Sequence, residues 1–167
     1  MALAFAQRGV RPAVVRFPPS VHGRGDHGFV PILINIAREK GVSAYPGDGA
    51  NRWAAVHRLD AAHLFRLAVE AAVSGVRLNG VGDEGVSARE IAEVIGRRLA
   101  LPVVSVRREE AVDHFGCLGA FFSRDLPATS VKTRRGMGWE PVQPGLIADL
   151  DEGHYFETAP APAAVMT

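Results

Sequence analysis

The fold is decided by a stretch that reads Arg11-Pro-Ala-Val-Val-Arg-Phe-Pro-Pro19. Its apolar and β-branched residues predict a buried strand, and the two prolines end that strand sharply. A glycine-rich loop over 20–28 follows, and the next segment predicts a helix over 29–40. Pro31 suits the first turn of this helix, and Gly41 suits its end. A strand, a loop and a helix in this order indicate the start of an α/β unit.

Strands and helices continue to alternate downstream. Further strands are predicted over 43–45, 53–57, 77–81 and 103–106, and further helices over 60–74, 88–99, 109–122 and 145–155. Asp60 is expected to cap the helix over 60–74, whose core face would carry Leu64, Phe65, Ala68 and Ala72. Ser87-Ala-Arg-Glu90 is a capping box, which starts the helix over 88–99. The alternation predicts an α/β fold with a doubly wound parallel sheet.

The chain has 167 residues, which corresponds to one domain at about 150 residues each. We expect this domain to span 1–156, and we expect 157–167 to be a disordered tail, because the tail has no periodic apolar face. The first nine residues resemble the end of a helix that stops at Gly9. They lack the charged start and long apolar core of a secretory signal, so a cytoplasmic location is expected.

Composition excludes several classes of protein. Lys and Arg total 19 and Asp and Glu total 18, so the net charge is +1, and a dedicated nucleic-acid partner is not expected. No apolar run approaches the roughly 18 residues that span a membrane. A single cysteine, Cys117, rules out an internal disulfide and is expected to be a small core residue.

Two glycine patterns match G-x-G-x-x-G, the fingerprint of dinucleotide binding. The first is Gly23-Arg-Gly-Asp-His-Gly28, with Asp48 where a ribose-binding acid would lie. The sequence predicts no strand running into Gly23, which disfavours this match. The second is Gly80-Val-Gly-Asp-Glu-Gly85, which would place two carboxylates against a phosphate. We therefore interpret neither pattern as the fingerprint.

The remaining chemistry-bearing residues favour ordinary structural roles. His22 and His27 flank Asp26, but the loop offers no third ligand at a suitable spacing, so no metal site is expected. His57 is interpreted as a histidine packed at the end of a strand. The arginine pairs at 97–98, 107–108 and 134–135 are dispersed among acids and are expected on the surface.

Several segments together resemble the extended short-chain dehydrogenase/reductases, the NAD-dependent epimerase/dehydratase group, over about residues 3–150. The segments that carry the resemblance are Val14–Gly23, Tyr45-Pro-Gly-Asp-Gly49, Asn51-Arg52, Val56-His57, Asp60-Ala-Ala, Ser87-Ala-Arg-Glu-Ile91, Thr133 and Gly138-Trp-Glu-Pro141. Met137 stands where the family usually has leucine. The segments match only the C-terminal half of such an enzyme, that is, the late strands of a Rossmann-like sheet and the smaller substrate-binding region.

The resemblance implies two groups of site residues. Pro18, Pro19, Ser20 and Val21 would flank the nicotinamide ring of NAD or NADP. Phe29, Asn51 and Arg52 would line the substrate pocket. Arg124 would contact a phosphate of a nucleotide-sugar substrate, a contact for which guanidinium geometry is suited. A plain surface arginine is the alternative for Arg124.

The family's catalytic elements have no counterpart in the sequence. The Gly-x-x-Gly-x-x-Gly turn is not found before residue 11, and neither tyrosine is followed by lysine four places later. We therefore expect no catalytic residue in this chain and weak or absent dinucleotide binding. The strand over 11–17 should keep an open edge, so self-association or a separate N-terminal half is expected. The alternative function is a non-catalytic subunit or binding module that completes its sheet with another chain.

Overall fold

A computed structural model describes residues 2–71 and 73–157, so the predicted tail beyond Glu157 lies outside the described residues. The strands are β1 Val14–Arg16, β2 Ser20–His22, β3 Ser43–Pro46, β4 Arg52–His57, β5 Arg77–Asn79, β6 Asp83–Ser87 and β7 Val103–Val106. The α-helices are α1 Phe29–Lys40, α2 Arg58–Ala71, α3 Ala88–Leu99, α4 Ala111–Phe115, α5 Gly119–Phe122, α6 Val131–Met137 and α7 Leu146–Asp151. Short 3-10 helices are η1 Ala2–Arg8, η2 Arg108–Glu110 and η3 Gly116–Leu118. The predicted α/β class is confirmed.

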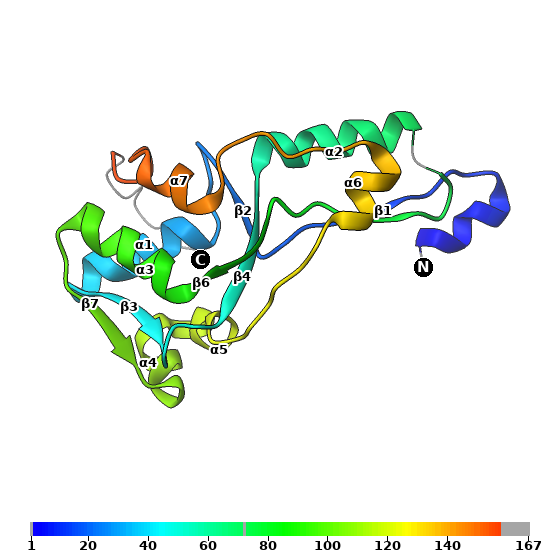
Figure 1. Cartoon of the computed structure of the whole chain (residues 1–167). Helices are drawn as coiled ribbons and strands as arrows, with labels where there is room; N and C mark the ends of the chain where they lie inside the picture. Colours follow the sequence, from blue (N-terminus) through cyan, green and yellow to red (C-terminus); the bar gives the residue numbers. More distant parts are fainter. Residues whose placement is uncertain (1, 72, 158–167) are drawn as a thin grey trace, which may run out of the picture.

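The strands form three small sheets that are mostly parallel. β1 pairs in parallel with β5, and β3 pairs in parallel with β7. In the third sheet β4 is central, parallel to β2 and antiparallel to β6. Figure 1 shows an elongated molecule in which β1, β5, α2 and α6, here called the arm, project from a body that contains α1, α3, α7 and β3. Parallel strands joined through helices are typical of a doubly wound fold.

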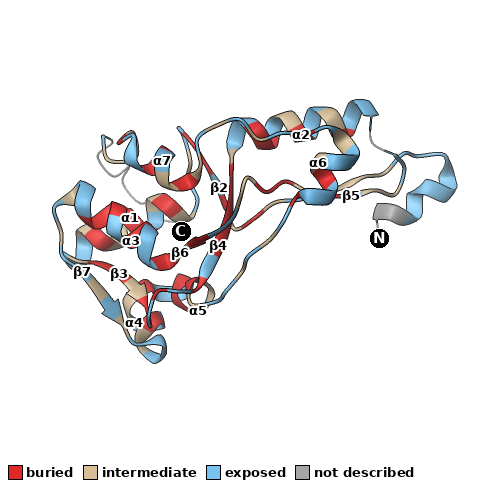
Figure 2. Cartoon of the chain, viewed as in Figure 1, coloured by how far each residue is buried: buried red, intermediate tan, exposed pale blue. Residues whose placement is uncertain are grey.

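Two hydrophobic cores meet at β4. The larger core fills the body and includes Trp53 and Ile91. The smaller core fills the arm and includes Val56, Leu64 and Trp139. Figure 2 shows that buried residues dominate the body and β4, whereas much of the arm surface is exposed. Because Trp53 and Val56 belong to different cores, β4 connects the arm to the body.

Several local predictions are confirmed. α1 spans Phe29–Lys40 as predicted and ends at Gly41, whose φ of 69° is the left-handed conformation that glycine adopts without strain. The capping box is present, because the Ser87 side chain accepts from the Glu90 N–H and the Glu90 carboxylate accepts from the Ser87 N–H. β7 spans Val103–Val106, and the N-terminal turn ends before Gly9 as expected, although it is a 3-10 helix.

Asp60 does not cap α2, which begins two residues earlier at Arg58. Instead its buried carboxylate accepts hydrogen bonds from the backbone N–H groups of Val142 and Gln143, each at 3.1 Å. The Asp60 carbonyl also accepts from the indole N–H of buried Trp139 at 3.0 Å. Asp60 thus fastens a segment some eighty residues away, a role that local helix signals do not reveal.

Other predictions are wrong in detail. The helix over 109–122 is broken, because Gly116 takes a φ of 62° that ends α4. Cys117 lies in this break and is exposed rather than in the core. Phe65 is 51% exposed and is not on the core face of α2, while Ala72 lies outside the described residues. β2 forms where a loop was expected, because it pairs with β4, and β6, for which no strand was predicted, pairs with β4 as well.

We predict that Asp60→Ala destabilises the chain by about 2–4 kcal/mol, because two partly buried backbone N–H groups lose a charged acceptor that is itself buried. Unfolding in urea, followed by circular dichroism, measures this loss. Asp151→Asn is the matched control, since that carboxylate forms only an exposed pair with Arg97 and should leave the midpoint nearly unchanged. Equal effects of the two substitutions would contradict this role of Asp60.

Candidate functional site

The predicted cofactor segment joins the arm to the body. Pro18 and Pro19 follow the end of β1, and Ser20 and Val21 form the start of β2. Ser20 lies opposite Ala55 of β4 and is buried, whereas Val21 is partly exposed. The Ser20 hydroxyl has no hydrogen-bond partner among the described residues. Because a buried hydroxyl is normally paired, this group is suited to contact a polar ligand or a water molecule.

The predicted substrate residues Asn51, Arg52 and Arg124 come together at the start of β4. The segment after α5 runs beside this strand, and the Leu126 N–H donates to the Arg52 carbonyl at 2.7 Å. The buried Asn51 amide donates to the Phe122 carbonyl at 2.7 Å and fixes the turn that carries Arg124. Residues more than 70 positions apart in the sequence therefore form one surface.

Arg52 is already paired within this surface. Its guanidinium donates two hydrogen bonds to Asp125, at 3.1 and 2.9 Å, and its backbone N–H donates a third at 2.8 Å. Hydrogen bonding to Asp125 raises the pKa of Arg52, and hydrogen bonding to Arg52 lowers the pKa of Asp125. The exposed Arg124 side chain forms no hydrogen bond or ion pair with the described part of the chain. It is therefore the cation of this cluster whose charge is not neutralised locally.

Phe29 reaches the same region through an aromatic cluster. Its ring meets the Trp53 ring edge-on at 4.9 Å and stacks on Phe121 at 5.5 Å, so it lies behind Arg52 on β4. The Trp53 indole N–H is buried without a partner among the described residues. An open groove of about 390 Å³ runs past Arg52 and is lined by Glu84, Gly85, Pro127, Ala128 and Thr129. Of the four predicted substrate residues, Arg52 lines this groove, whereas buried Asn51 supports the neighbouring turn.

A second polar cluster was missed by sequence reasoning. Buried His22 donates from Nδ1 to Asp149 at 2.8 Å, and His154 donates from Nε2 to the other oxygen of Asp149 at 2.9 Å. Tyr155 accepts from the Gly23 N–H at 2.8 Å and donates to Asp26 at 3.2 Å. These contacts tie α7 and the following turn to the loop after β2. No local signal reveals the contacts of Asp149 with His22 and of Tyr155 with Gly23 and Asp26, because these partners are more than 120 residues apart.

Burial and hydrogen bonding together shift the pKa values of this cluster. Burial acts to raise the pKa of Asp149, but hydrogen bonds from His22 and His154 outweigh it, and the net shift is downward. Burial raises the pKa values of Asp26 and Tyr155. His57 packs edge-on against His22, as expected for a histidine at a strand end, and burial lowers its pKa.

The ligand geometry does not favour a metal ion here. Asp149, Glu152 and His154 place ligand atoms within 4.8 Å of one another. Both oxygens of Asp149, however, already accept hydrogen bonds from histidines. The set considered from the sequence, His22 with Asp26 and His27, is not brought together as ligands, because His22 turns toward Asp149.

The first glycine pattern has a context different from the one expected. β2 does run into Gly23, and α1 begins directly after Gly28, so the predicted lack of a preceding strand is wrong. The groups that would hold a phosphate are nevertheless taken. The Gly28 N–H donates to the Asp26 carboxylate at 2.6 Å, and the Gly23 N–H donates to Tyr155. A carboxylate occupies the anion position, which disfavours a pyrophosphate there.

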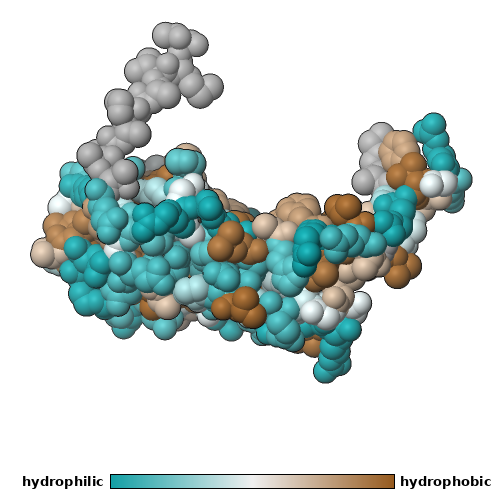
Figure 3. All heavy atoms as spheres, turned by 90° about the horizontal axis from the view of Figure 1, so that it is seen from above, coloured by the Kyte–Doolittle hydropathy of each residue, from teal (hydrophilic) through white to brown (hydrophobic). Residues whose placement is uncertain are grey.

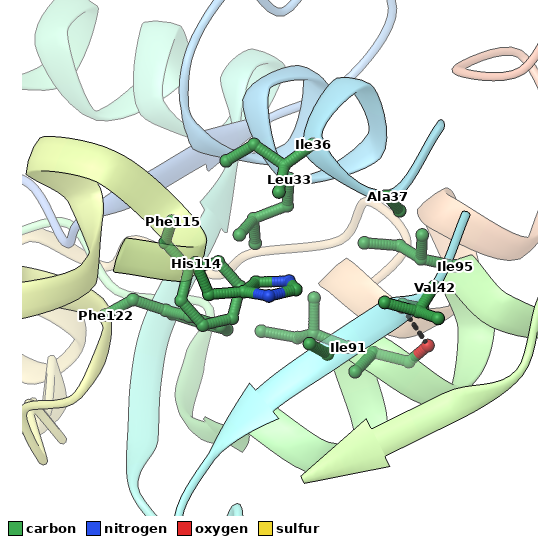
Figure 4. A pocket seen from close by; sticks show the side chains of 12 residues that line it. Leu33, Ile36, Ala37, Val42, Ile91, Ile95, His114, Phe115 and Phe122 are labelled. Atoms are coloured by element: carbon green, nitrogen blue, oxygen red, sulfur yellow. Dashed lines mark hydrogen bonds between the residues drawn. The ribbon is translucent and has the colours of Figure 1, made fainter. Parts of the chain in front are cut away.

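A small enclosed cavity lies elsewhere in the body, between α1, β3, α3 and α4 (Figure 4). Its volume of about 10 Å³ is close to the minimum for one water molecule. His114 projects among Leu33, Ile91 and Phe122, and burial lowers its pKa. This apolar cavity is too small for a nucleotide or a sugar.

The fold is that of part of the nucleotide-sugar dehydratases and epimerases. The chain matches a dTDP-glucose 4,6-dehydratase from Streptomyces venezuelae, solved with NAD bound, with a TM-score of 0.68 and 20% identity over 92% of this chain and 46% of that one. An epimerase from Methanothermobacter thermautotrophicus matches with a TM-score of 0.70 and 21% identity, over 92% of this chain and 46% of the epimerase. At these identities the likeness establishes the fold alone.

Two uncharacterized fungal proteins are similar to this chain in sequence. One, from Schizosaccharomyces pombe, is 52% identical over 154 residues, which are 92% of this chain and 52% of the relative. The other, from Saccharomyces cerevisiae, is 49% identical over 150 residues, which are 90% of this chain and 50% of the relative. The chain therefore spans about half the length of these relatives. No family model matches the chain.

Within the described residues, no helix is long and apolar enough to cross a membrane.

We predict that Asp149 makes stability depend on acid pH. Its folded-state pKa lies below the ordinary value of about 3.9, so its contacts stabilise the fold above about pH 4 and are lost as pH falls through the folded pKa. Urea unfolding between pH 3 and 7 should show a steeper loss below pH 4 for the wild type than for Asp149→Asn. The exposed Asp113→Asn variant should keep the wild-type slope. Equal slopes for all three proteins would contradict the prediction.

Proposed function

We propose that residues 1–156 are the C-terminal portion of an NAD(P)-dependent oxidoreductase of the extended short-chain dehydrogenase/reductase type, an epimerase or dehydratase. One observation carries the proposal. The substrate residues Asn51 and Arg52 lie at the start of β4, which pairs with β2 at Ser20, while the cofactor segment Pro18–Val21 follows the carboxyl end of parallel strand β1. Ligands of open α/β sheets bind outside the carboxyl ends of the strands. The fold likeness to NAD-bound dehydratases supports this assignment.

The residues of this chain would bind and orient rather than transfer protons. Backbone groups of Pro18–Val21 would flank the nicotinamide ring, and the unpaired Ser20 hydroxyl would contact its carboxamide. This fits the buried orphan hydroxyl described above. NAD or NADP supplies hydride exchange at a substrate carbinol carbon when bound. The general acid and base would come from outside this chain, because its sequence contains no Tyr-x-x-x-Lys pair.

A nucleotide sugar is the proposed substrate class. Related folds include a UDP-glucose 4-epimerase solved with UDP-glucose and a protein solved with UDP-glucuronic acid and NAD. Arg124, exposed and without a local counter-ion, would contact a phosphate. Asn51 and the pair formed by Arg52 with Asp125 would hold the turn that presents Arg124. Phe29 would close the apolar side of the pocket.

The alternative is a non-catalytic binding subunit of the same fold. The lack of a catalytic pair in the sequence favours it. The two functions predict different results when the rest of the fold is added to this chain. An oxidoreductase portion gains NAD(P) binding and turnover when the rest of the fold is supplied, whereas a binding subunit gains neither.

We predict that the chain alone binds NAD and NADP weakly or not at all, because the pyrophosphate meets no free helix N-terminus. Calorimetric titration measures this binding. Coexpression with the part of the Schizosaccharomyces pombe relative outside the matched 154 residues should create measurable binding. Within that complex, Ser20→Ala should weaken dinucleotide binding by about 2- to 10-fold, the effect of one hydrogen bond. Binding tighter than about 1 μM by the chain alone, or no binding by the complex, would overturn the proposal.

We also predict that the purified chain is catalytically silent with NAD(P) and nucleotide sugars. In the coexpressed complex, Arg124→Ala should weaken nucleotide-sugar binding by about 10-fold or more, because a charge-assisted contact to phosphate is lost. NAD(P) binding should be unchanged. Arg135→Ala, an exposed arginine of α6, is the matched control and should change neither. Turnover by the chain alone that a substitution within 1–167 abolishes would contradict the expected silence.

A further inference from the structure

We propose that the β1 side of the arm is a docking surface for the remainder of the α/β fold, received as a strand that pairs with β1 and a helix that packs on α2. The surface consists of the free edge of β1 with Phe65, Val69 and Val73, and is here called the β1-side surface. The inference rests on the proposed function and names the partner that the proposed function requires.

The helical part of this surface is an apolar stripe without a covering element. Phe65 and Val69 of α2 lie four residues apart, the spacing of one helix face, and Val73 follows beyond the end of the helix; the three side chains are 51%, 72% and 76% exposed, respectively. The buried residues of α2, among them Leu64 and Ala68, point to the arm core instead. Figure 3, which views the molecule from above, shows hydrophobic side chains gathered on the surface of the arm. Contiguous exposed apolar side chains of this kind mark interaction surfaces.

Two contacts place this stripe on the β1 side of α2. The Phe65 ring packs on Phe17, just beyond the end of β1, with the ring centres 5.1 Å apart. Arg11, just before β1, donates to the Val69 carbonyl. On another side, α2 is covered by Trp139, whose indole N–H donates to the Asp60 carbonyl. The stripe therefore lies beside the edge strand, on the side that the arm leaves open.

The strand part of the surface is an unpaired edge. Among residues 2–71 and 73–157, β5 is the only strand that pairs with β1. Val14 and Val15 are half-buried, because the arm core covers one side of the strand. A parallel strand is normally buried between neighbours and both faces, so a strand with one neighbour presents free N–H and C=O groups.

The occupant follows from the length of the relatives. The fungal proteins match this chain at about 50% identity yet are twice as long, and the solved folds extend beyond the match to a similar degree. A further strand could pair with the free edge of β1, and a further helix could cover the apolar side of α2, as in a larger α/β fold. The arm core has six buried residues, whereas the body core has eighteen, so the arm has most to gain from such a neighbour.

Light scattering and calorimetry, without cofactor, test the surface. The wild-type chain is titrated with the part of the Schizosaccharomyces pombe relative outside the matched residues. We expect a one-to-one complex, and the double variant Phe65→Asp and Val69→Asp should weaken it by at least about 100-fold, because two apolar side chains would be buried with charge. The variant should keep the wild-type circular dichroism spectrum, since both side chains are exposed in the free chain. Val112→Asp, equally exposed on α4, is the matched control and should bind like the wild type.

Each other outcome overturns the inference. No complex with this segment, a complex that the double variant leaves intact, or a dimer of this chain that the double variant abolishes would each refute it. The proposed function fails separately. A complex that forms through the β1-side surface but binds neither NAD nor NADP would refute the oxidoreductase assignment and leave the docking surface standing.

Discussion

Strand β4 is the constraint on which the rest of the structure depends. Its residues from Trp53 to Val56 are almost completely buried, and the strand pairs with β2 on one side and β6 on the other. A strand that is enclosed in this way cannot shift register without moving its apolar side chains out of both cores. The fixed register of β4 therefore fixes the positions of the segments that precede and follow it. Arg52 lies at one end of β4, on the proposed substrate surface, and α2 begins directly after the other end, in the arm.

Two buried carboxylates, of Asp60 and Asp149, and the half-buried carboxylate of Asp83 fix the return of the chain across this framework. Asp60 accepts from the backbone at Val142 and Gln143, Asp83 accepts from Leu146, and Asp149 accepts from His22. Each contact links positions more than 60 residues apart and satisfies groups that would be costly to bury alone. Apolar packing would tolerate several paths for the segment after α6. Directional hydrogen bonds select one path, and that path brings Tyr155 against the loop after β2.

The sequence predicts those features of the fold that depend on residues close together in the chain. The bounds of α1 follow from Pro31 and Gly41, and the start of α3 follows from its capping box, because these signals act within one helical turn. Asp60 was misread as a helix cap, since its partners are distant in the sequence. β2 was read as a loop, because three residues carry no periodicity and only pairing with β4 makes them a strand. The substrate residues were predicted from family resemblance, and their gathering at β4 requires the fold. The His22 cluster has no sequence signal at all.

The two halves of the proposed site differ in how complete they are. Asn51, Arg52, Arg124 and Phe29 are held by body elements around the larger core, with hydrogen bonds and aromatic contacts that need no further chain. Pro18–Val21, in contrast, follow β1, whose other edge is free. The position of this segment therefore depends on β2 at one end and on the arm at the other. Under the proposed function, the substrate side is organised within this chain, whereas the cofactor side becomes fixed only when the β1-side surface is covered. Docking and dinucleotide binding would then be coupled, because each orders the same short segment.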